Sequence, residues 1–346
     1  MFNCNAFTNH LCITVSGFIT PCCRFQGFQQ KFNYKTVNYE DHFTVNSNGW
    51  VIGCENCKLE EERGKNSYRN THNENFGKSD KIEFLELSLS NKCNLTCRMC
   101  GPKESDKWYN LIEENEELRK FFGKSSNPTQ LSIMKLFSTM DLSNLTHIKY
   151  LGGEPFITPE FKILCEYLSR KNLIEGMSLW INTNITIFPT KVMRYLNQFK
   201  KVYLALSLDG IGNVNEYIRY GKSWDIIEKN IDNFVAIKSN KIYPYIHTTV
   251  QAYNVHSIYD LIKFAEHKTL DCHQNELRFP KHLAINALSP TYIDCIKDKY
   301  NRDYFTNYSF DRDSNDKLQE FTIKMDSIFN NNIADIIPNW QRNYDR

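Results

Sequence analysis

FLELSLSNKCNLTCRMC, residues 84–100, joins an apolar run to three closely spaced cysteines. The run 84–90 is rich in Leu and is bounded by polar residues, which predicts a buried strand. Cys93, Cys97 and Cys100 follow it directly with the spacing C-x3-C-x2-C. In parallel α/β folds the reactive groups gather in the loops that leave the strand ends. The stretch therefore predicts an α/β protein with a metal-binding loop after its first main strand.

From residue 80 onward, apolar strand-like runs alternate with amphipathic stretches. The predicted strands are 84–90, 147–152, 177–182, 201–208, 243–252 and 276–285. The predicted helices are roughly 103–121, 159–171, 189–199, 223–238 and 256–267. Strands that alternate with helices indicate a parallel sheet, either open or closed into a barrel. The segment from 291, including KLQEFTIKMDSIF, is predicted to be helical.

Polar motifs follow four of these strands. The cysteine triplet follows the first, LGGEP (151–155) the second, INTN (181–184) ends the third, and SLDG (207–210) ends the fourth. Because parallel strands end at one edge of a sheet, we expect the four motifs to form a single site.

Composition narrows the class of protein. The chain has 346 residues, 41% of them hydrophobic, and a formal charge of +2. This balance creates no strong field toward nucleic acid or anionic lipid, so a nucleic-acid partner is not expected. No run is long and apolar enough to span a membrane, and the start MFNCNAFTNH lacks the features of a secretion signal. These features predict a cytoplasmic protein, in which clustered thiols bind metals or catalyse rather than form disulfides.

The triplet provides three ligands, one fewer than a structural zinc site normally uses. A cubane [4Fe-4S] cluster fits the number better, because Cys93, Cys97 and Cys100 can each bind one iron and leave the fourth iron open. An open iron is a place where a small molecule can bind.

The triplet after the first strand and GGEP after the second together resemble the radical S-adenosylmethionine (SAM) superfamily. The resemblance covers about residues 80–290 and implies a partial (β/α)6 TIM-type barrel. It also implies that SAM chelates the open iron of a [4Fe-4S] cluster and is cleaved reductively to a 5′-deoxyadenosyl radical, which abstracts hydrogen from a substrate. The family pattern assigns SAM-binding roles to Gly152, Gly153, Glu154, Asn182, Asn184, Ser207, Asp209 and Arg219.

Several of these assignments have a physical reason. Glycines let the backbone approach a ligand closely, as the resemblance implies for the SAM amino group at GGEP. Asn182–Asn184 resembles the TNG segment near the SAM ribose, with Ile185 where Gly is usual. The guanidinium of Arg219 suits the SAM carboxylate. A surface ion pair is the alternative for Arg219.

The N-terminal segment, residues 1–79, resembles the Cys-rich extension called SPASM or twitch in radical SAM enzymes. The resemblance selects Cys4, Cys22 (or Cys23), Cys54 and Cys57 as ligands of an auxiliary iron-sulfur cluster. Zinc at these sulfurs, or no metal, remains an alternative. In most relatives the extension follows the barrel, whereas here it precedes it. We therefore expect three regions: a small Cys-rich domain (1–79), the barrel (80–290) and a helical C-terminal extension (291–346).

The expected function is radical SAM chemistry on a substrate that is a peptide or protein side chain. Modification of a small metabolite, sugar or nucleotide is the alternative. An electron donor such as flavodoxin or ferredoxin is the expected partner. A non-enzymatic zinc-stabilised binding module, pairing Cys54 and Cys57 with Cys97 and Cys100, is a third hypothesis. The sequence identifies no catalytic acid or base.

Overall fold

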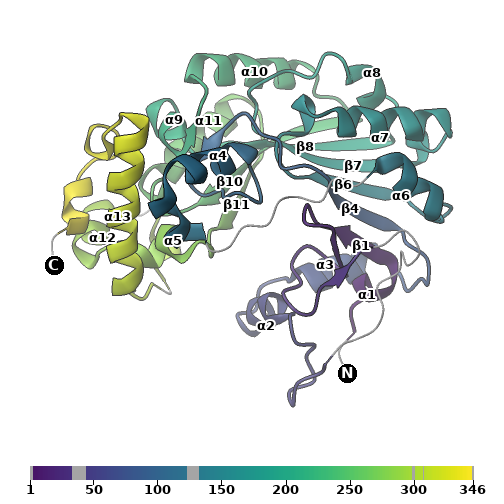
Figure 1. Cartoon of the computed structure of the whole chain (residues 1–346), viewed down its shortest axis with the longest axis horizontal. Helices are drawn as coiled ribbons and strands as arrows, with labels where there is room; N and C mark the ends of the chain where they lie inside the picture. The colour runs from purple at the N-terminus through teal and green to yellow at the C-terminus, as the bar shows by residue number, and fades with distance from the viewer. Residues whose placement is uncertain (1–2, 33–43, 123–131, 298–300, 307, 345–346) are drawn as a thin grey trace.

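A nine-stranded sheet forms the centre of the molecule in a computed structural model, which describes residues 3–32, 44–122, 132–297, 301–306 and 308–344 (Figure 1). From one edge to the other the strands are β11 (Cys272–Glu276), β10 (Ile242–Val250), β8 (Lys201–Ser207), β7 (Ser178–Thr183), β6 (His147–Leu151), β4 (Phe84–Ser88), β1 (His10–Ile13), β2 (Phe18–Thr20) and β3 (Gln30–Lys31). Within this sheet, neighbouring strands pair in parallel throughout the set β4, β6, β7, β8, β10 and β11, as the alternating pattern predicted. They form the partial barrel of an α/β fold.

The last strand differs from its prediction. The sequence pattern placed it at 276–285, but β11 covers Cys272–Glu276, and the predicted run instead forms two short 3-10 helices, η5 (Lys281–Leu283) and η6 (Ile285–Ala287). Pro280 has no N–H for a strand ladder, and the apolar side chains after it pack into a core with the C-terminal helix. Strand β11 itself is polar and mostly exposed at the sheet edge, so it lacks the apolar alternation that signals a strand.

Helices cover one face of the parallel sheet, and the other face forms the inside of the partial barrel. The outer helices are α6 (Ile133–Thr139), α7 (Pro159–Arg170), α8 (Met193–Leu196), α10 (Trp224–Ala236) and α11 (Ile258–His267). Strand residues such as Leu85 and Val202 pack beneath them with Phe161 and Phe234. Because side chains alternate along a strand, Glu86 and Ser88 point to the opposite face, where they line a cavity.

The N-terminal segment is joined to the barrel sheet. Strand β1 pairs in parallel with β4, with His10 opposite Phe84 and Ile13 opposite Leu87. Three short helices, α1 (Ala6–Asn9), α2 (Glu55–Glu62) and α3 (Tyr68–Asn75), lie below β1 and β4 in Figure 1. The domain boundary at 79/80 stays a prediction, and the β1–β4 ladder crosses it.

The C-terminal region packs on the end of the barrel through a second core. Its main helices are α12 (Pro290–Ile296) and α13 (Arg312–Phe329), which confirms the helical prediction for KLQEFTIKMDSIF. Phe321, Met325 and Trp340 pack there with Trp108 of α4 (Asp106–Glu114). The short helices η1 (Glu116–Leu118) and α5 (Arg119–Phe122) follow α4. Among the helices in the described part of the chain, none has the length and apolar character needed to cross a bilayer.

Candidate functional site

The cysteine triplet lies in the loop between β4 and α4, and the backbone of this loop is fixed at each cysteine. The Cys93 N–H donates to Asp106 Oδ1 at 2.9 Å, and the Cys100 N–H donates to the Cys97 carbonyl at 3.0 Å. Cys97 lies in the two-residue strand β5 (Thr96–Cys97), which pairs antiparallel with β9 (Arg219–Tyr220), so that Cys97 is opposite Arg219. These hydrogen bonds and the β5–β9 pairing hold the loop in place from within the chain.

Of the three cysteines of the triplet, Cys97 is buried and Cys93 and Cys100 are half-buried. Burial raises the pKa of Cys93 to about 11. The sulfurs of Cys97 and Cys100 hydrogen-bond each other, which lowers the pKa of Cys97 and raises that of Cys100. The positive charge of Arg219 lies near both thiols. It adds to the lowering of the pKa of Cys97 and opposes part of the rise in the pKa of Cys100. Iron ions would replace the protons on such thiols, so this donor set fits a cluster in which each thiolate binds a different iron.

The GGEP motif packs against the triplet loop. Gly152 and Gly153 have φ values of +91° and +52°. A Cβ atom on Gly152 would lie 2.4 Å from Ser88 Oγ, and one on Gly153 would lie 2.1 Å from the Lys92 carbonyl oxygen. Glycine is therefore required here by contact with the residues that lead into Cys93, in addition to any approach of SAM.

Glu154 connects the second motif to the third. Its fully buried carboxylate accepts from Thr183 Oγ1 at 3.0 Å, from the Asn184 N–H at 2.6 Å and from the Phe156 N–H at 3.1 Å. Burial raises the pKa of Glu154 to about 7, against these hydrogen bonds, which lower it. Through these hydrogen bonds Glu154 holds the segment after β6 against the end of β7.

The third motif reaches the triplet directly. Asn184 Nδ2 lies 3.6 Å from Cys93 Sγ and 2.8 Å from Asn94 Oδ1. Ile185, which stands where the family pattern has Gly, has φ +65° and is fully buried. The backbone therefore keeps a glycine-like turn although the residue is β-branched, a conformation that is strained for Ile. Asn182 is the residue before the last one of β7 and is half-buried.

The fourth motif and Arg219 form a buried ion pair. Asp209 Oδ2 is 2.7 Å from Arg219 Nε, and Asp209 Oδ1 accepts from the Thr249 N–H at 2.8 Å. The side chain of Arg219 is only 12% exposed. The alternative that Arg219 forms an ion pair at the surface is therefore wrong, because its pair with Asp209 is buried. Burial alone would lower the pKa of Arg219, but the negative charge of Asp209 and the nearby thiols of Cys97 and Cys100 raise it above its ordinary value. Ser207 lies close by at the end of β8, opposite His247.

The N-terminal cysteines come from three separate segments. Cys4 precedes α1, Cys22 follows β2, and Cys54 and Cys57 lie at the start of α2. Burial raises the pKa of Cys4 to about 11 and that of Cys54 to about 12, and neighbouring thiols add to both shifts: Cys57 acts on Cys4, and Cys4 and Cys57 act on Cys54. Cys4 also acts on Cys22. Cys4, Cys54 and Cys57 are therefore close enough to affect the pKa of one another, and Cys4 is close enough to affect the pKa of Cys22.

Cys23 has different neighbours from Cys22. Its N–H donates to Glu86 Oε2 at 3.2 Å. Its sulfur lies 3.7 Å from Lys149 Nζ, which is paired with Glu86 Oε1 at 2.6 Å. Sequence reasoning missed this ion pair. The sequence does contain a feature that indicates this pair: Glu86 and Lys149 each lie inside an apolar strand run, FLELS and HIKYL.

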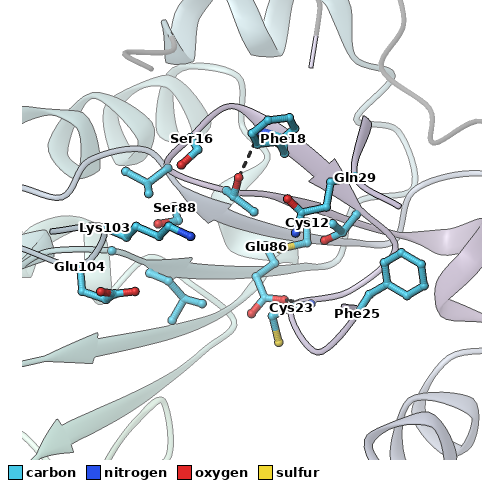
Figure 2. Close-up of a pocket in the computed structure, with 15 residues that line it drawn as sticks. Cys12, Ser16, Phe18, Cys23, Phe25, Gln29, Glu86, Ser88, Lys103 and Glu104 are labelled. Carbon is cyan, nitrogen blue, oxygen red and sulfur yellow. Dashed lines mark hydrogen bonds between the residues drawn. The ribbon is translucent and has the colours of Figure 1, made fainter. Parts of the chain in front are cut away.

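A cavity of about 470 Å³ joins the two regions. Ser88 and Gly152 line it on the side of the triplet loop, and Cys12 and Cys23 line it on the side of the N-terminal segment. Figure 2 shows Cys23 beside Glu86 within this lining. The N-terminal extension therefore reaches the same space as the GGEP motif, although it precedes the barrel in the chain.

Among the described residues, no three His, Cys, Asp or Glu side chains converge closely enough to hold a single metal ion. A zinc ion needs every ligand atom at roughly 2.0–2.3 Å from one point. A cubane instead binds each thiolate at a different iron. The lack of a single-ion site among the described residues therefore does not test the two proposed clusters.

Comparison with known proteins agrees with the arrangement of these motifs. Residues 87–265, just over half of the chain, match the model of the Radical SAM superfamily. A GTP 3',8-cyclase of Clostridium perfringens is 26% identical over 201 residues, which are 57% of this chain and 56% of the cyclase. An Fe-coproporphyrin III synthase of Methanosarcina barkeri is 27% identical over 140 residues, 40% of this chain and 30% of the synthase. The chain thus spans about half or less of these curated relatives.

Solved structures that match this chain include native anSMEcpe with bound AdoMet, with a TM-score of 0.42 and 18% identity over 72% of this chain and 62% of that one. SuiB of Streptococcus suis bound to S-adenosylmethionine has a TM-score of 0.36 and 14% identity over 73% of this chain and 46% of that one. The family match itself covers the triplet, the GGEP motif and the Asp209–Arg219 pair. This chain belongs to the radical SAM superfamily, whose enzymes use a [4Fe-4S] cluster and S-adenosylmethionine.

Proposed function

We propose that Cys93, Cys97 and Cys100 bind the [4Fe-4S] cluster and that SAM binds across the four strand-end motifs beside it. The proposed SAM-binding residues are Gly152, Gly153, Glu154, Asn182, Asn184, Ser207, Asp209 and Arg219. When bound, the cluster and SAM supply the chemistry, in which an electron splits the sulfonium and the resulting 5′-deoxyadenosyl radical abstracts hydrogen from a substrate.

The residues of the chain hold and orient these groups. The buried carboxylate of Glu154 fixes Asn184, whose amide lies 3.6 Å from Cys93 Sγ. Asp209 orients Arg219 through its Nε atom at 2.7 Å. A guanidinium held in this way is pre-organised for a carboxylate, such as that of SAM.

The cavity of about 470 Å³ carries the substrate proposal, because residues beside the triplet loop and residues of the N-terminal segment line it together. Its size falls in the range of small-ligand pockets and suits one side chain of a peptide or protein with its flanking backbone. We propose that such a side chain is the site of hydrogen abstraction.

A nucleotide is the second candidate, because a GTP 3',8-cyclase is among the curated relatives. The charge of the cavity disfavours it. A nucleoside triphosphate carries several negative charges, which proteins bind with basic side chains. Among the described residues that line the cavity, Lys103 is the one basic side chain, and the adjacent Lys149 is paired with Glu86.

We propose further that residues 1–79 are a SPASM/twitch-like extension in which Cys4, Cys22, Cys54 and Cys57 bind an auxiliary iron-sulfur cluster. The contacts of Cys23 with Glu86 and Lys149 favour Cys22 over Cys23 as the fourth ligand. Such a cluster would exchange electrons with a substrate radical. A flavodoxin or ferredoxin is the proposed external reductant.

The test is an anaerobic count of iron and sulfide on reconstituted protein, followed by assay of 5′-deoxyadenosine after addition of SAM and dithionite. About eight irons with 5′-deoxyadenosine formation are expected for two cubane clusters. About four irons would restrict iron to the triplet, and bound zinc without SAM cleavage would overturn the proposed site. GTP and a mixed peptide library are then compared for stimulation of 5′-deoxyadenosine formation, and stimulation by GTP alone would overturn the peptide proposal.

A further inference from the structure

Arg98, between the second and third cysteines of the triplet, is fully buried. Its backbone N–H donates to the Ile218 carbonyl at 2.8 Å, and its Nε donates to the Tyr217 carbonyl at 2.9 Å. Both acceptors directly precede Arg219 in the chain. Arg98 therefore fixes the triplet loop to the segment that carries Arg219.

The same guanidinium reaches the C-terminal extension. One terminal nitrogen of Arg98 donates to Asp326 Oδ1 of α13 at 2.8 Å and to Asn331 Oδ1 at 3.0 Å. Its guanidinium carbon lies 3.8 Å from the centre of the Tyr217 ring, which is a cation–π contact. A buried Arg requires such partners, because an unpaired charge in the interior is costly.

Asp326 is the shared acceptor of this network. The Tyr217 hydroxyl donates to Asp326 Oδ1 at 2.8 Å, and the Ile333 N–H donates to Oδ2 at 2.8 Å. Beside it, the ring of Phe329 in α13 stacks on Tyr220 of β9 with centres 3.8 Å apart. Helix α13 thus contacts Arg98, which follows β5, and Tyr220 of β9, the two strands in which Cys97 is opposite Arg219.

We propose that Arg98 and Asp326 are positioning residues for SAM, and that α13 through them sets the separation between the cluster loop and Arg219. This inference rests on the proposed cluster and SAM site. In that site SAM would be held by the cluster loop and by the guanidinium of Arg219 together, so a shift between the two segments would weaken SAM binding while each segment stays intact. The C-terminal extension is then part of the SAM-binding machinery rather than a separate appendage.

The test measures the KM for SAM in reductive 5′-deoxyadenosine formation by the full-length, reconstituted protein. Asp326→Asn, which removes the negative charge at nearly constant volume, is expected to raise the KM for SAM about tenfold, with the iron content unchanged. Glu320→Gln is the matched control, because Glu320 lies on the same helix and pairs with Lys120 of α5 at the exposed surface. Its KM should equal that of the wild type.

Tyr217→Phe removes only the hydroxyl that donates to Asp326 and is expected to raise the KM for SAM about threefold. It carries the test if Asp326→Asn fails to fold. A wild-type KM in either folded and iron-loaded variant would overturn the proposal, as would an equal rise in Glu320→Gln. Wild-type protein that binds no iron or cleaves no SAM would instead overturn the cluster site, so the two failures are distinguishable.

Discussion

The two groups of cysteines are built in opposite ways. The triplet occupies one continuous loop, and its backbone is fixed by the β5–β9 pair, by Asp106 and by the buried Arg98. The N-terminal set comes from three segments that are held by short helices and turns, and this region meets the barrel through the β1–β4 ladder and through Glu86. The comparison teaches that contacts of its own loop fix the backbone of the triplet. The arrangement of the N-terminal cysteines instead depends on how three segments pack together and against the barrel.

The strongest test of this comparison is Cys97→Ala. Because Cys97 is proposed to bind one iron of the SAM-cleaving cluster, its loss is expected to abolish 5′-deoxyadenosine formation, measured anaerobically with SAM and dithionite. Cys295→Ala is the control, since Cys295 is an exposed thiol of α12 far along the chain from either group. Retained SAM cleavage in Cys97→Ala would remove the triplet from the site.

A second test separates neighbouring cysteines. Cys22→Ala is expected to lower the iron content by about half, from about eight to about four, while SAM cleavage at the triplet persists. Cys23→Ala is the matched control and should keep the full iron content, since Cys23 contacts Glu86 and Lys149 instead. The reverse result, with iron lost only in Cys23→Ala, would exchange the two assignments.

One contact between the regions, the one that involves Glu86, is tested by Glu86→Gln. Glu86 is 1% exposed and pairs with Lys149 at 2.6 Å, so removal of its charge leaves Lys149 without its partner. The free energy of unfolding in urea is expected to fall by about 4 kcal/mol. Lys162→Gln, which breaks the more exposed pair with Glu166 on α7, should cost less than about 1 kcal/mol.

The pH dependence of the Glu86 effect has a defined sign. Burial alone would raise the pKa of Glu86, but Lys149 and His10 hold it well below the ordinary value of 4.5. The stabilisation is therefore present above pH 4.5 and is lost as the pH falls below it. Equal stability of Glu86→Gln and wild type at neutral pH would contradict the role of this pair.

Glu154 gives the smallest expected effect and the opposite sign. Burial raises its pKa from 4.5 to about 7, so between these values the folded protein keeps a proton that the unfolded chain has lost. Stability falls as the pH rises through this window, by about 3 kcal/mol from this group. The measurement compares urea unfolding of wild type and Glu154→Gln at both ends of the window. Parallel pH profiles would show that Glu154 does not titrate there.

The sequence predicted those parts of the site that are contiguous in the chain. The triplet, GGEP and the strand-end motifs could be found because each combines unusual residues within a few positions, and the repeated strand–helix pattern places them at one edge. The family match confirms the radical SAM prediction, and since its members are enzymes, the zinc-stabilised binding module is wrong. The peptide substrate, the site residues and the auxiliary cluster stay predictions.

Long-range contacts could not be predicted from the sequence. Arg98 reaches Asp326 across 228 positions, and Cys23 reaches Glu86 across 63, so no local pattern marks either pair. Strand β11 was misplaced because an exposed edge strand does not need apolar side chains, whereas the apolar run after it is buried by α13. In each case a tertiary contact outweighs the local pattern.

The parallel pairing of β1 with β4 also has a consequence for how the chain acquires its structure. The first strand leaves the ribosome well before its partner, because residues 14–83 separate the two. A parallel ladder closed over such a distance forms late, since its loop-closure entropy must be overcome first. The N-terminal cysteines are therefore not expected to be in place in a nascent chain, and delivery of iron to them should follow synthesis of the barrel.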